Sequence, residues 1–477
     1  MVALLLVTVS KCVLVFFIIC NGFQTVLLVG ALREMVRHLR TNWSEGAHRL
    51  LSLEATPRVT VLAPAFNEAV TAAASVRSLL TLHYPNLEVV VINDGSTDDT
   101  LEILKGEFDL SEVSPSFPTA VESKPVVGLY RSTRHRGLVV LDKVNGGKAD
   151  SLNAGLNVAT GELVCAIDAD TLIEPAALLR IVRPFLTDDA TVAAGATIRV
   201  VNDATVRDGR VVAVRASTRA LPGIQTVEYL RSFLFGRLGW NTIGGNLIVS
   251  GAFGMFRRSA MIDTGGYRHD TVGEDMELVV RLRRSGVRQR GPSKVVFVPD
   301  PVAWTEVPES LPVLARQRER WQRGLTDVLW RHRGMLFNPR YGRIGWVAMP
   351  YFWIVELMGP AVEALGLVAM VLALAFGAVN MPFAVLFLLV AYGWGLLLTL
   401  SSLLLHQATA EEPFQASDLP ALIGWSLAEN LGYRQLTVAW RLKGTWRYLR
   451  GRRDWGTMSR TGFRPPTGSE VDHREIA

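Results

Sequence analysis

Residues 162–171 read ELVCAIDADT, a run of mostly apolar side chains that ends in two aspartates at a spacing of two. A continuous apolar run of this length is typical of a strand that is buried on both faces of a parallel sheet. Asp168 and Asp170 would then stand where that strand ends. Carboxylates held there offer hard oxygen ligands to Mg²⁺ or Mn²⁺, although the pair alone is a weak signal because this spacing also occurs by chance.

Short β-rich runs alternate with helical patterns on both sides of this stretch, from Arg58 onward. The β-rich runs are RVTVLAP, LEVVVINDG, LVVLD near residue 140 and TVAAGATIRV near residue 195, and the helical patterns EAVTAAASVRSLLTL and STDDTLEILKGEF separate the first of them. This alternation predicts an α/β domain with a Rossmann-like, mostly parallel sheet, whose ligands bind beyond the carboxyl ends of the strands. Residues 111–125 are expected to form a polar surface loop.

Polar side chains follow three of the predicted strands. They lie in PAFNE (64–68), NDGSTDDT (93–100) and DADT (168–171). The carboxyl ends of parallel strands meet at one edge of a sheet, so these clusters are expected to converge. The alternative is that Asp94 and Gly95 only form a turn and that Ser96 or Thr97 only caps a helix, and the two interpretations are compatible.

Two apolar zones flank this predicted domain. Hydrophobic residues make up 49% of the 477 residues, and charged residues make up 20%. Residues 1–32 are expected to be an uncleaved transmembrane anchor rather than a signal peptide, because the positive charges follow the apolar run. Residues 344–405 are long enough for at least two spans, with a break expected at Asn380–Met381–Pro382. For residues 418–436 a third span and a helix in the membrane interface both stay open.

The formal charge of +6 comes from basic clusters beside the apolar zones and from a basic C-terminal stretch. Such clusters are typical of cytoplasmic flanks, so the domain between the zones is expected to face the cytosol from the plasma membrane. The clusters include Arg33, Arg37, Arg40, Arg331, Arg333, Arg340 and Arg343. No nucleic-acid-binding motif accompanies the charge, which favours membrane lipids over nucleic acid as the partner. The three cysteines form neither a disulfide framework nor a zinc pattern.

Six motifs occur in order along the chain: PAFNE, NDGSTDDT, NGGKADSLNAG (145–155), DADT, GED (273–275) and QRERW (317–321). This set resembles the inverting family 2 glycosyltransferases of GT-A fold. It is most similar to their membrane-embedded processive members, the cellulose, hyaluronan, chitin and poly-N-acetylglucosamine synthases. The resemblance spans about residues 58–335. It is specific for the fold and the reaction class, and poorly specific for the sugar.

The resemblance implies a role for each motif. The donor, a UDP-sugar, would be bound by Pro64, Asn67, Glu68, Asp94, Lys148, Asp168, Gln317 and Arg320; Asp170 and Asp168 would hold Mg²⁺ or Mn²⁺; Asp275 would be the catalytic base with Glu274 beside it; and Trp321 would stack on the acceptor sugar. Inversion needs a base opposite the leaving group, which is the position that the GED motif implies for Asp275. The alternatives are that the two acids only stabilise a helix N-terminus and that Trp321 only anchors a helix at headgroups.

These expectations divide the chain into six parts: an anchor (1–32), a basic juxtamembrane segment (33–57), a cytosolic GT-A domain (58–308), interfacial amphipathic helices (309–343), a C-terminal membrane region of two or three helices (344–440) and a basic tail (441–477). Glu356 and Glu363 in the second apolar zone indicate either a sugar path or an interhelical hydrogen bond.

The expected function is polymerisation of a β-linked polysaccharide from UDP-GlcNAc or UDP-glucose and its transfer across the membrane. Two alternatives stay open, namely addition of one sugar to a glycolipid acceptor, and binding of a nucleotide-sugar without turnover.

Overall fold

A ten-stranded mixed sheet forms the core of the α/β domain, in the order β3-β4-β5-β2-β1-β6-β11-β8-β12-β7. The computed structural model describes residues 2–44, 56–168, 171–207, 210–291, 293–378, 381–409 and 413–451. The strands of the sheet are β1 (Val59–Ala65), β2 (Leu87–Asn93), β3 (Leu110–Val113), β4 (Val126–Ser132), β5 (Leu138–Lys143), β6 (Leu163–Ile167), β7 (Leu172–Ile173), β8 (Thr191–Val200), β11 (Phe253–Arg257) and β12 (Lys294–Thr305). A separate hairpin consists of β9 (Thr205–Arg207) and β10 (Arg210–Ala213).

The sheet contains both parallel and antiparallel pairs; its centre is parallel, and so is the outer pair of β8 with β12. β1 pairs in parallel with β2 and β6, and β2 pairs in parallel with β5. β11 runs antiparallel between β6 and β8, while β3 and β4 add an antiparallel edge. The sheet is therefore the expected GT-A-like sheet, with parallel pairs at its centre and antiparallel pairs on both sides of them. β11 is apolar almost throughout because it is buried on both faces, so its sequence pattern does not distinguish it from a parallel strand.

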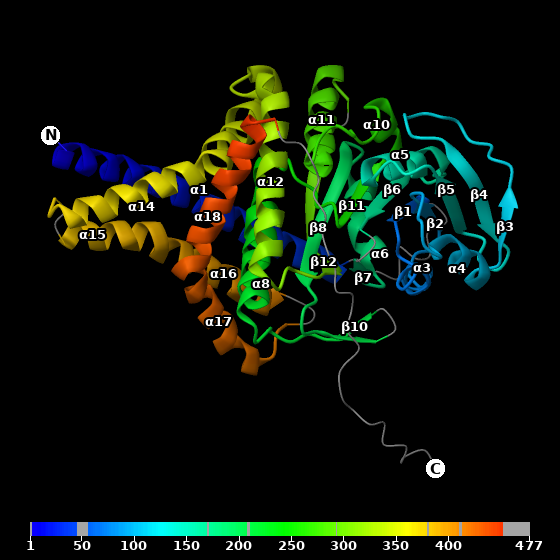
Figure 1. Cartoon of the computed structure of the whole chain (residues 1–477), viewed down its shortest axis with the longest axis horizontal. Coiled ribbons are helices and arrows are strands. Elements are labelled where there is room, and N and C mark those ends of the chain that lie inside the picture. The colour runs from blue at the N-terminus through cyan, green and yellow to red at the C-terminus, as the bar shows by residue number, and fades with distance from the viewer. Residues whose placement is uncertain are drawn as a thin grey trace, which may run out of the picture.

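Helices cover both faces of the sheet. Successive residues of a strand point to opposite faces, so each strand contributes to two apolar clusters. Val89 and Val91 of β2 belong to one apolar cluster, and Val90 and Ile92 belong to the other. The first cluster is closed by α3 (Ala72–Leu80), α4 (Thr100–Glu107) and α6 (Ala177–Ile181), and the second by α5 (Lys148–Val158), α10 (Arg258–Asp263) and α11 (Glu274–Gln289) (Figure 1). Of the expected loop at 111–125, the first three residues belong to β3, and the remainder forms no helix or strand.

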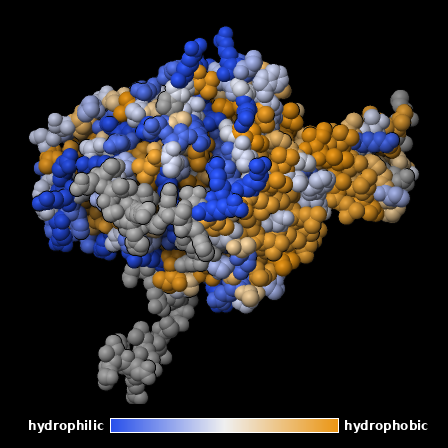
Figure 2. Space-filling model, turned by 180° about the vertical axis from the view of Figure 1, so that it is seen from behind, coloured by the Kyte–Doolittle hydropathy of each residue, from blue (hydrophilic) through white to orange (hydrophobic). Residues whose placement is uncertain are grey.

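Long apolar helices project from the domain. They are α1 (Val2–Ser44), α14 (Gly359–Ala375), α15 (Met381–Leu388) and α16 (Trp394–Thr409), joined by η4 (Ile344–Ala348), α13 (Met349–Tyr351), η5 (Phe352–Leu357) and η6 (Leu389–Gly393). Leu4–Arg40 and Met381–Thr409 are long and apolar enough to cross a membrane, and Ile344–Leu357 with Gly359–Ala375 forms a third candidate bent by 43°. Figure 2 shows a broad hydrophobic surface over the projecting part and a hydrophilic surface over the sheet domain. The protein is therefore membrane-associated. Asn380, in the expected break, lies outside the described residues.

A group of helices lies between the sheet domain and the projecting helices. It consists of α8 (Ala220–Leu230), η1 (Arg231–Arg237), α9 (Leu238–Ile243), α12 (Leu311–Arg331), α17 (Leu419–Ala428), η8 (Glu429–Tyr433) and α18 (Arg434–Leu449). α12 and α18 run side by side, across the direction of α1 and α14 (Figure 1). α17 continues into η8, where the dihedral angles of Leu431 and Gly432 are not helical, and 418–436 is not among the candidate spans of the described residues. The remaining short elements are α7 (Arg183–Thr187), η2 (Arg333–Met335), η3 (Pro339–Tyr341) and η7 (Ala416–Asp418).

The two acids of the second apolar zone both meet arginines of α18. Glu363 forms an ion pair with Arg434 at 2.6 Å. The carboxylate of Glu356 lies 3.4 Å from the guanidinium of Arg441 and accepts a hydrogen bond from Tyr351 at 3.4 Å. An intramembrane acid is costly unless it is paired, so these contacts support the interhelical interpretation over a sugar path.

Candidate active site

The turns after β1 and β2 are tied to each other. Pro64 lies in β1 opposite Ile92. The side-chain oxygen of Asn67 accepts a hydrogen bond from the Thr97 N–H at 2.8 Å, and the Glu68 N–H donates to Thr100 Oγ1 at 2.9 Å. The PAFNE and NDGSTDDT motifs therefore meet at the carboxyl edge of the sheet, as their order along parallel strands predicts.

Asp94 lies below this edge rather than in an open pocket. It is 4% exposed, and its carboxylate pairs with Lys143 at 2.7 Å. It also accepts hydrogen bonds from the N–H groups of Gly146 and Gly147 at 2.9 and 2.7 Å. A buried carboxylate with this many donors has its negative charge well compensated. Asp94 thus shapes the turn that precedes Lys148, and direct donor binding by Asp94 stays a prediction.

Two motifs line one small pocket, and a third contacts it through Asp168. Its lining consists of Lys148, Leu152, Ala166, Ser250, Gly251, Phe256, Tyr267, Glu274 and Asp275. Lys148 opens α5, forms an ion pair with Asp168 at the end of β6, and donates to the Gly251 carbonyl at 3.2 Å. Asp275 in the first turn of α11 accepts a hydrogen bond from the Gly251 N–H at 3.1 Å. The structure therefore brings Lys148, Asp168, Glu274 and Asp275 together.

Two ionisable groups of the pocket have shifted pKa values. Glu274 is 5% exposed, and its burial raises its pKa to about 7, with Lys148 acting against the shift and Asp275 adding to it. Burial alone would lower the pKa of Lys148, but Asp168, Glu274 and Asp275 hold that pKa above its ordinary value. At neutral pH the pocket thus contains a firmly charged lysine and a glutamate that is close to its titration midpoint. Perturbed groups of this kind are enriched in active sites.

Four residues of the site belong to none of the six sequence motifs. Ser250, Gly251 and Tyr267 line the pocket, but they belong to no acidic or amide cluster. Arg237 ends η1, and its Nη1 is buried without a hydrogen-bond partner among the described residues. Burial lowers the pKa of Arg237 to about 10, although the charge of Asp275 acts in the opposite direction.

The QRERW helix contacts the GED turn through two glycines. A Cβ atom on Gly273 would lie 3.0 Å from the Cα of Gly324, and a Cβ on Gly324 would lie 3.1 Å from the Cα of Gly273. Gln317, Arg320 and Trp321 precede Gly324 by seven, four and three residues, so all four share one face of α12. The motif residues therefore lie on the same helix face as the glycine that contacts the GED turn.

The three motif residues on this face differ in burial. Gln317 is 9% exposed, and its Oε1 has no hydrogen-bond partner in the described part of the chain. Arg320 is half-buried, and Trp321 is 43% exposed.

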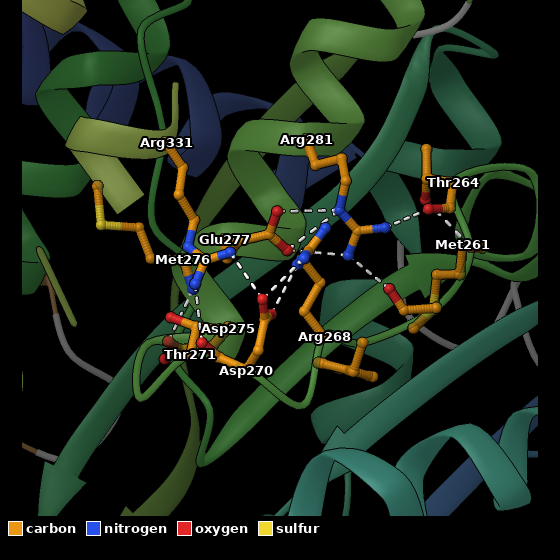
Figure 3. Close-up of polar contacts among 12 residues, drawn as sticks. Met261, Thr264, Arg268, Asp270, Thr271, Asp275, Met276, Glu277, Arg281 and Arg331 are labelled. Carbon is orange, nitrogen blue, oxygen red and sulfur yellow. Dashed lines mark hydrogen bonds and ion pairs between the residues drawn. The ribbon is translucent and has the colours of Figure 1, made fainter. Parts of the chain in front are cut away.

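Ion pairs join the C-terminal end of α12 to residues 268–270, which precede α11 (Figure 3). Arg331 pairs with Asp270 at 2.9 Å, and Arg268 pairs with the same carboxylate at 2.8 Å. The hydrogen bond from Arg268, reinforced by Arg331, holds the pKa of Asp270 well below its usual range. Glu277, one turn into α11, lies 3.3 Å from the ring of His332. The C-terminal end of α12 is therefore joined both to the residues before Gly273 and to the first turns of α11.

The metal prediction falls partly outside the described residues, since Asp170 is not among them. Within the described residues, no group of three or more His, Cys, Asp and Glu side chains could hold a metal ion. The half-buried side chain of Asp168 forms an ion pair with Lys148.

Comparison with known proteins agrees with this geometry. Residues 57–324 match the model of the family described as glycosyltransferase like family 2. The probable glycosyltransferase YdaM of Bacillus subtilis is 27% identical over 326 residues, which is 68% of this chain and 67% of that protein. The poly-beta-1,6-N-acetyl-D-glucosamine synthase of Staphylococcus aureus is 27% identical over 274 residues, or 57% of this chain, which spans about half (56%) of that protein.

Among solved structures, the mannosyltransferase PcManGT of Pyrobaculum calidifontis, in complex with GDP-Man and Mn²⁺, aligns with a TM-score of 0.52. It is 19% identical, and the alignment covers 90% of this chain and 99% of that one, so it shows the shared fold alone. The family model extends over more than half of the chain. The chain therefore belongs to glycosyltransferase-like family 2, and it is a glycosyltransferase.

Proposed function

We propose that the chain is an inverting, processive glycosyltransferase that extends a β-linked polysaccharide from UDP-GlcNAc or UDP-glucose. In this proposal the sheet domain lies in the cytosol, and the product crosses the plasma membrane that holds the projecting helices. One observation carries the proposal: the pocket with Lys148, Glu274 and Asp275 contacts, through Gly273 and Gly324, the helix that presents Trp321. That helix lies between the sheet domain and the candidate spans (Figure 1).

Asp275 is the base in this mechanism. The acceptor hydroxyl attacks the anomeric carbon opposite the UDP group, the hydroxyl proton moves to the Asp275 carboxylate, and UDP leaves with the electrons of the broken bond. The hydrogen bond from the Gly251 N–H holds this carboxylate in place at the start of α11. Glu274, with a pKa of about 7, can hold or release a proton beside it at neutral pH.

The cations of the site serve the donor. The ammonium group of Lys148 stabilises the negative charge that develops on the diphosphate, and the guanidinium of Arg320 offers paired N–H donors to phosphate oxygens. Pro64, Asn67 and Glu68 would form the wall towards the nucleoside. Asp94 would contribute through the Gly146–Gly147 turn, which it holds by two hydrogen bonds.

Asp168 and Asp170 are the residues that would hold Mg²⁺ or Mn²⁺. The chemistry of this pair fits a hard cation, since carboxylate oxygens are the ligands that both ions prefer. The position of Asp168 at the end of β6 supports the assignment. A bound ion would offset the charge of the leaving diphosphate. The Mn²⁺ in the complex of the archaeal mannosyltransferase is consistent with this proposal.

The proposed acceptor is the end of a growing polysaccharide. The exposed indole of Trp321 suits the apolar face of a pyranose, and one relative is named as a polysaccharide synthase. A lipid-linked acceptor is the second candidate, because Trp330 and Trp346 expose large apolar surfaces near the same helix.

Product length separates the two candidates. The purified protein in lipid nanodiscs is incubated with a panel of nucleotide-sugars and Mg²⁺ or Mn²⁺, UDP release is measured, and the products are sized. Polymer that lengthens before the donor is consumed supports processive synthesis. A product with one added sugar on a lipid would refute it, and the Asp275→Asn variant serves as the inactive control.

A further inference from the structure

The indole of Trp321 has a cation on one of its faces. The guanidinium carbon of Arg318 lies 4.5 Å from the centroid of the Trp321 ring. The two residues are three apart on α12 and therefore neighbours on its surface. Because Trp321 is still 43% exposed, the arginine does not enclose the ring. One face is covered, which leaves the other available for a ligand.

Arg318 is held by residues far away in the sequence. It is 6% exposed, and its Nη2 donates to Glu228 at 2.7 Å and to the Tyr433 hydroxyl at 3.2 Å. The Tyr433 O–H in turn donates to Glu228 at 2.8 Å. Glu228 belongs to α8 and Tyr433 to η8, so three elements converge on one guanidinium. Burial alone would lower the pKa of Arg318, but Glu228 keeps that pKa above its usual value, so the group stays a cation.

Contacts with α18 hold α12 as well, so the helix has little freedom to rotate. Glu319 pairs with Lys443 at 2.7 Å and with Arg447 at 2.5 Å, and Gln322 accepts a hydrogen bond from Arg441 at 2.8 Å. With the backbone of α12 held in this way, Arg318 is the cation that lies against the indole of Trp321.

We propose that Arg318 is a positioning residue for the acceptor: it fixes the plane of the Trp321 indole, is itself oriented by Glu228 and Tyr433, and leaves the second face of the ring for the apolar side of an acceptor pyranose. The inference rests on the proposed acceptor role of Trp321. It assigns different tasks to two arginines of one motif, since Arg320 serves the donor and Arg318 serves the acceptor through Trp321.

The expected change in the acceptor KM follows from the strength of a cation–π contact. Interactions of this type correspond to a factor of about 2 to 30 in an equilibrium constant, with the upper end for desolvated pairs. Removing the cation lets the indole sample other orientations, so the KM for the acceptor should rise by about 3- to 30-fold. The KM for the donor should stay within about twofold, because no donor contact is removed.

The test is a double-mutant cycle between Arg318 and Trp321. Arg318→Met, Trp321→Ala and the combined variant are assayed with cello- or chito-oligosaccharide primers that match the donor turned over. If Arg318 acts through the indole, Arg318→Met should raise the acceptor KM in the wild type and have no further effect in the Trp321→Ala background. Arg318→Lys should restore part of the affinity. Arg316→Met, at an exposed arginine of the same helix, is the matched control.

Two results would overturn the inference: equal effects of Arg318→Met with and without Trp321, or an equal rise in the donor KM. Should Arg318→Met fail to fold, Tyr433→Phe provides the test, since it removes a single O–H from the arrangement and should raise the acceptor KM alone, whereas an unchanged acceptor KM contradicts the inference. The proposed function fails separately. If Trp321→Ala itself leaves the acceptor KM unchanged, the acceptor site is not at Trp321, whatever Arg318 does.

Discussion

Replacing Gly324 with alanine should push the QRERW helix away from the GED turn. The new Cβ would lie 3.1 Å from the Gly273 Cα and 3.2 Å from the Gly273 nitrogen. Carbon atoms in ordinary contact are about 3.5–4.0 Å apart, so the two segments must separate by about 0.4–0.9 Å. Both neighbours are backbone atoms, and neither can move aside as a side chain would.

The expected loss is larger in rate than in stability. Overpacking costs about 1–3 kcal/mol, but alanine in a helix interior gains about 1 kcal/mol over glycine, so the unfolding free energy should fall by about 0–2 kcal/mol. A misplacement of about 1 Å can cost about 10²-fold in rate, so kcat/KM should fall by about tenfold or more. Gly273→Ala should act in the same way, because its φ of −125° is accessible to alanine and the effect is then one of contact.

The assay is the steady-state rate of UDP release in nanodiscs, together with thermal unfolding of the same samples. Gly106→Ala is the matched control, since Gly106 also lies in a helix and a Cβ there would meet nothing within 4 Å. If Gly324→Ala retained the wild-type kcat/KM, the glycine contact would have no part in positioning the acceptor helix against Asp275.

Three further outcomes are expected. Asp275→Asn should lower transfer by about 10²-fold or more while donor binding, measured by calorimetry, survives; a loss of donor affinity with intact transfer would contradict the assignment of the base. Burial raises the pKa of Glu274 to about 7, whereas a glutamate in the unfolded chain titrates near 4.3, so this group lowers the stability of the fold as the pH rises from about 4.5 to 7. The melting temperature of Glu274→Gln minus that of the wild type should therefore increase from pH 5 to pH 8. A constant difference would count against the burial effect. Glu363→Met alone should lower the melting temperature because it leaves Arg434 unpaired, and Glu363→Met/Arg434→Met should recover most of the loss; a double variant as unstable as the single one would show that the pair is not the cause.

The sequence predicts the parts of the site that depend on local pattern. Asp168, Glu274 and Asp275 follow strands or open a helix within short motifs, and parallel strands place such ends at one edge. The antiparallel direction of β11 is not predictable in this way, because a strand buried on both faces has the same apolar pattern in either direction.

Most of the features that the sequence does not predict are contacts between distant segments. Glu228, Arg318 and Tyr433 are about a hundred residues apart from one to the next, and no periodicity links them. Asp94 carries the expected motif, yet its partner Lys143 is an ordinary strand-terminal lysine until the fold buries it. Which side chain pairs with a buried polar group thus depends on the tertiary structure.

The pairing of α18 with two other parts of the chain has a consequence for biogenesis. Arg434 and Arg441 meet acids of the second apolar zone, while Lys443 and Arg447 meet Glu319 of α12. During translation α12 leaves the ribosome long before α18 does, with the apolar segments of residues 344–409 emerging between them. Until those segments have entered the bilayer and the C-terminal helix has docked, Glu319 lacks both of its cations. Completion of α18 is therefore required before α12 acquires its ion pairs with Lys443 and Arg447.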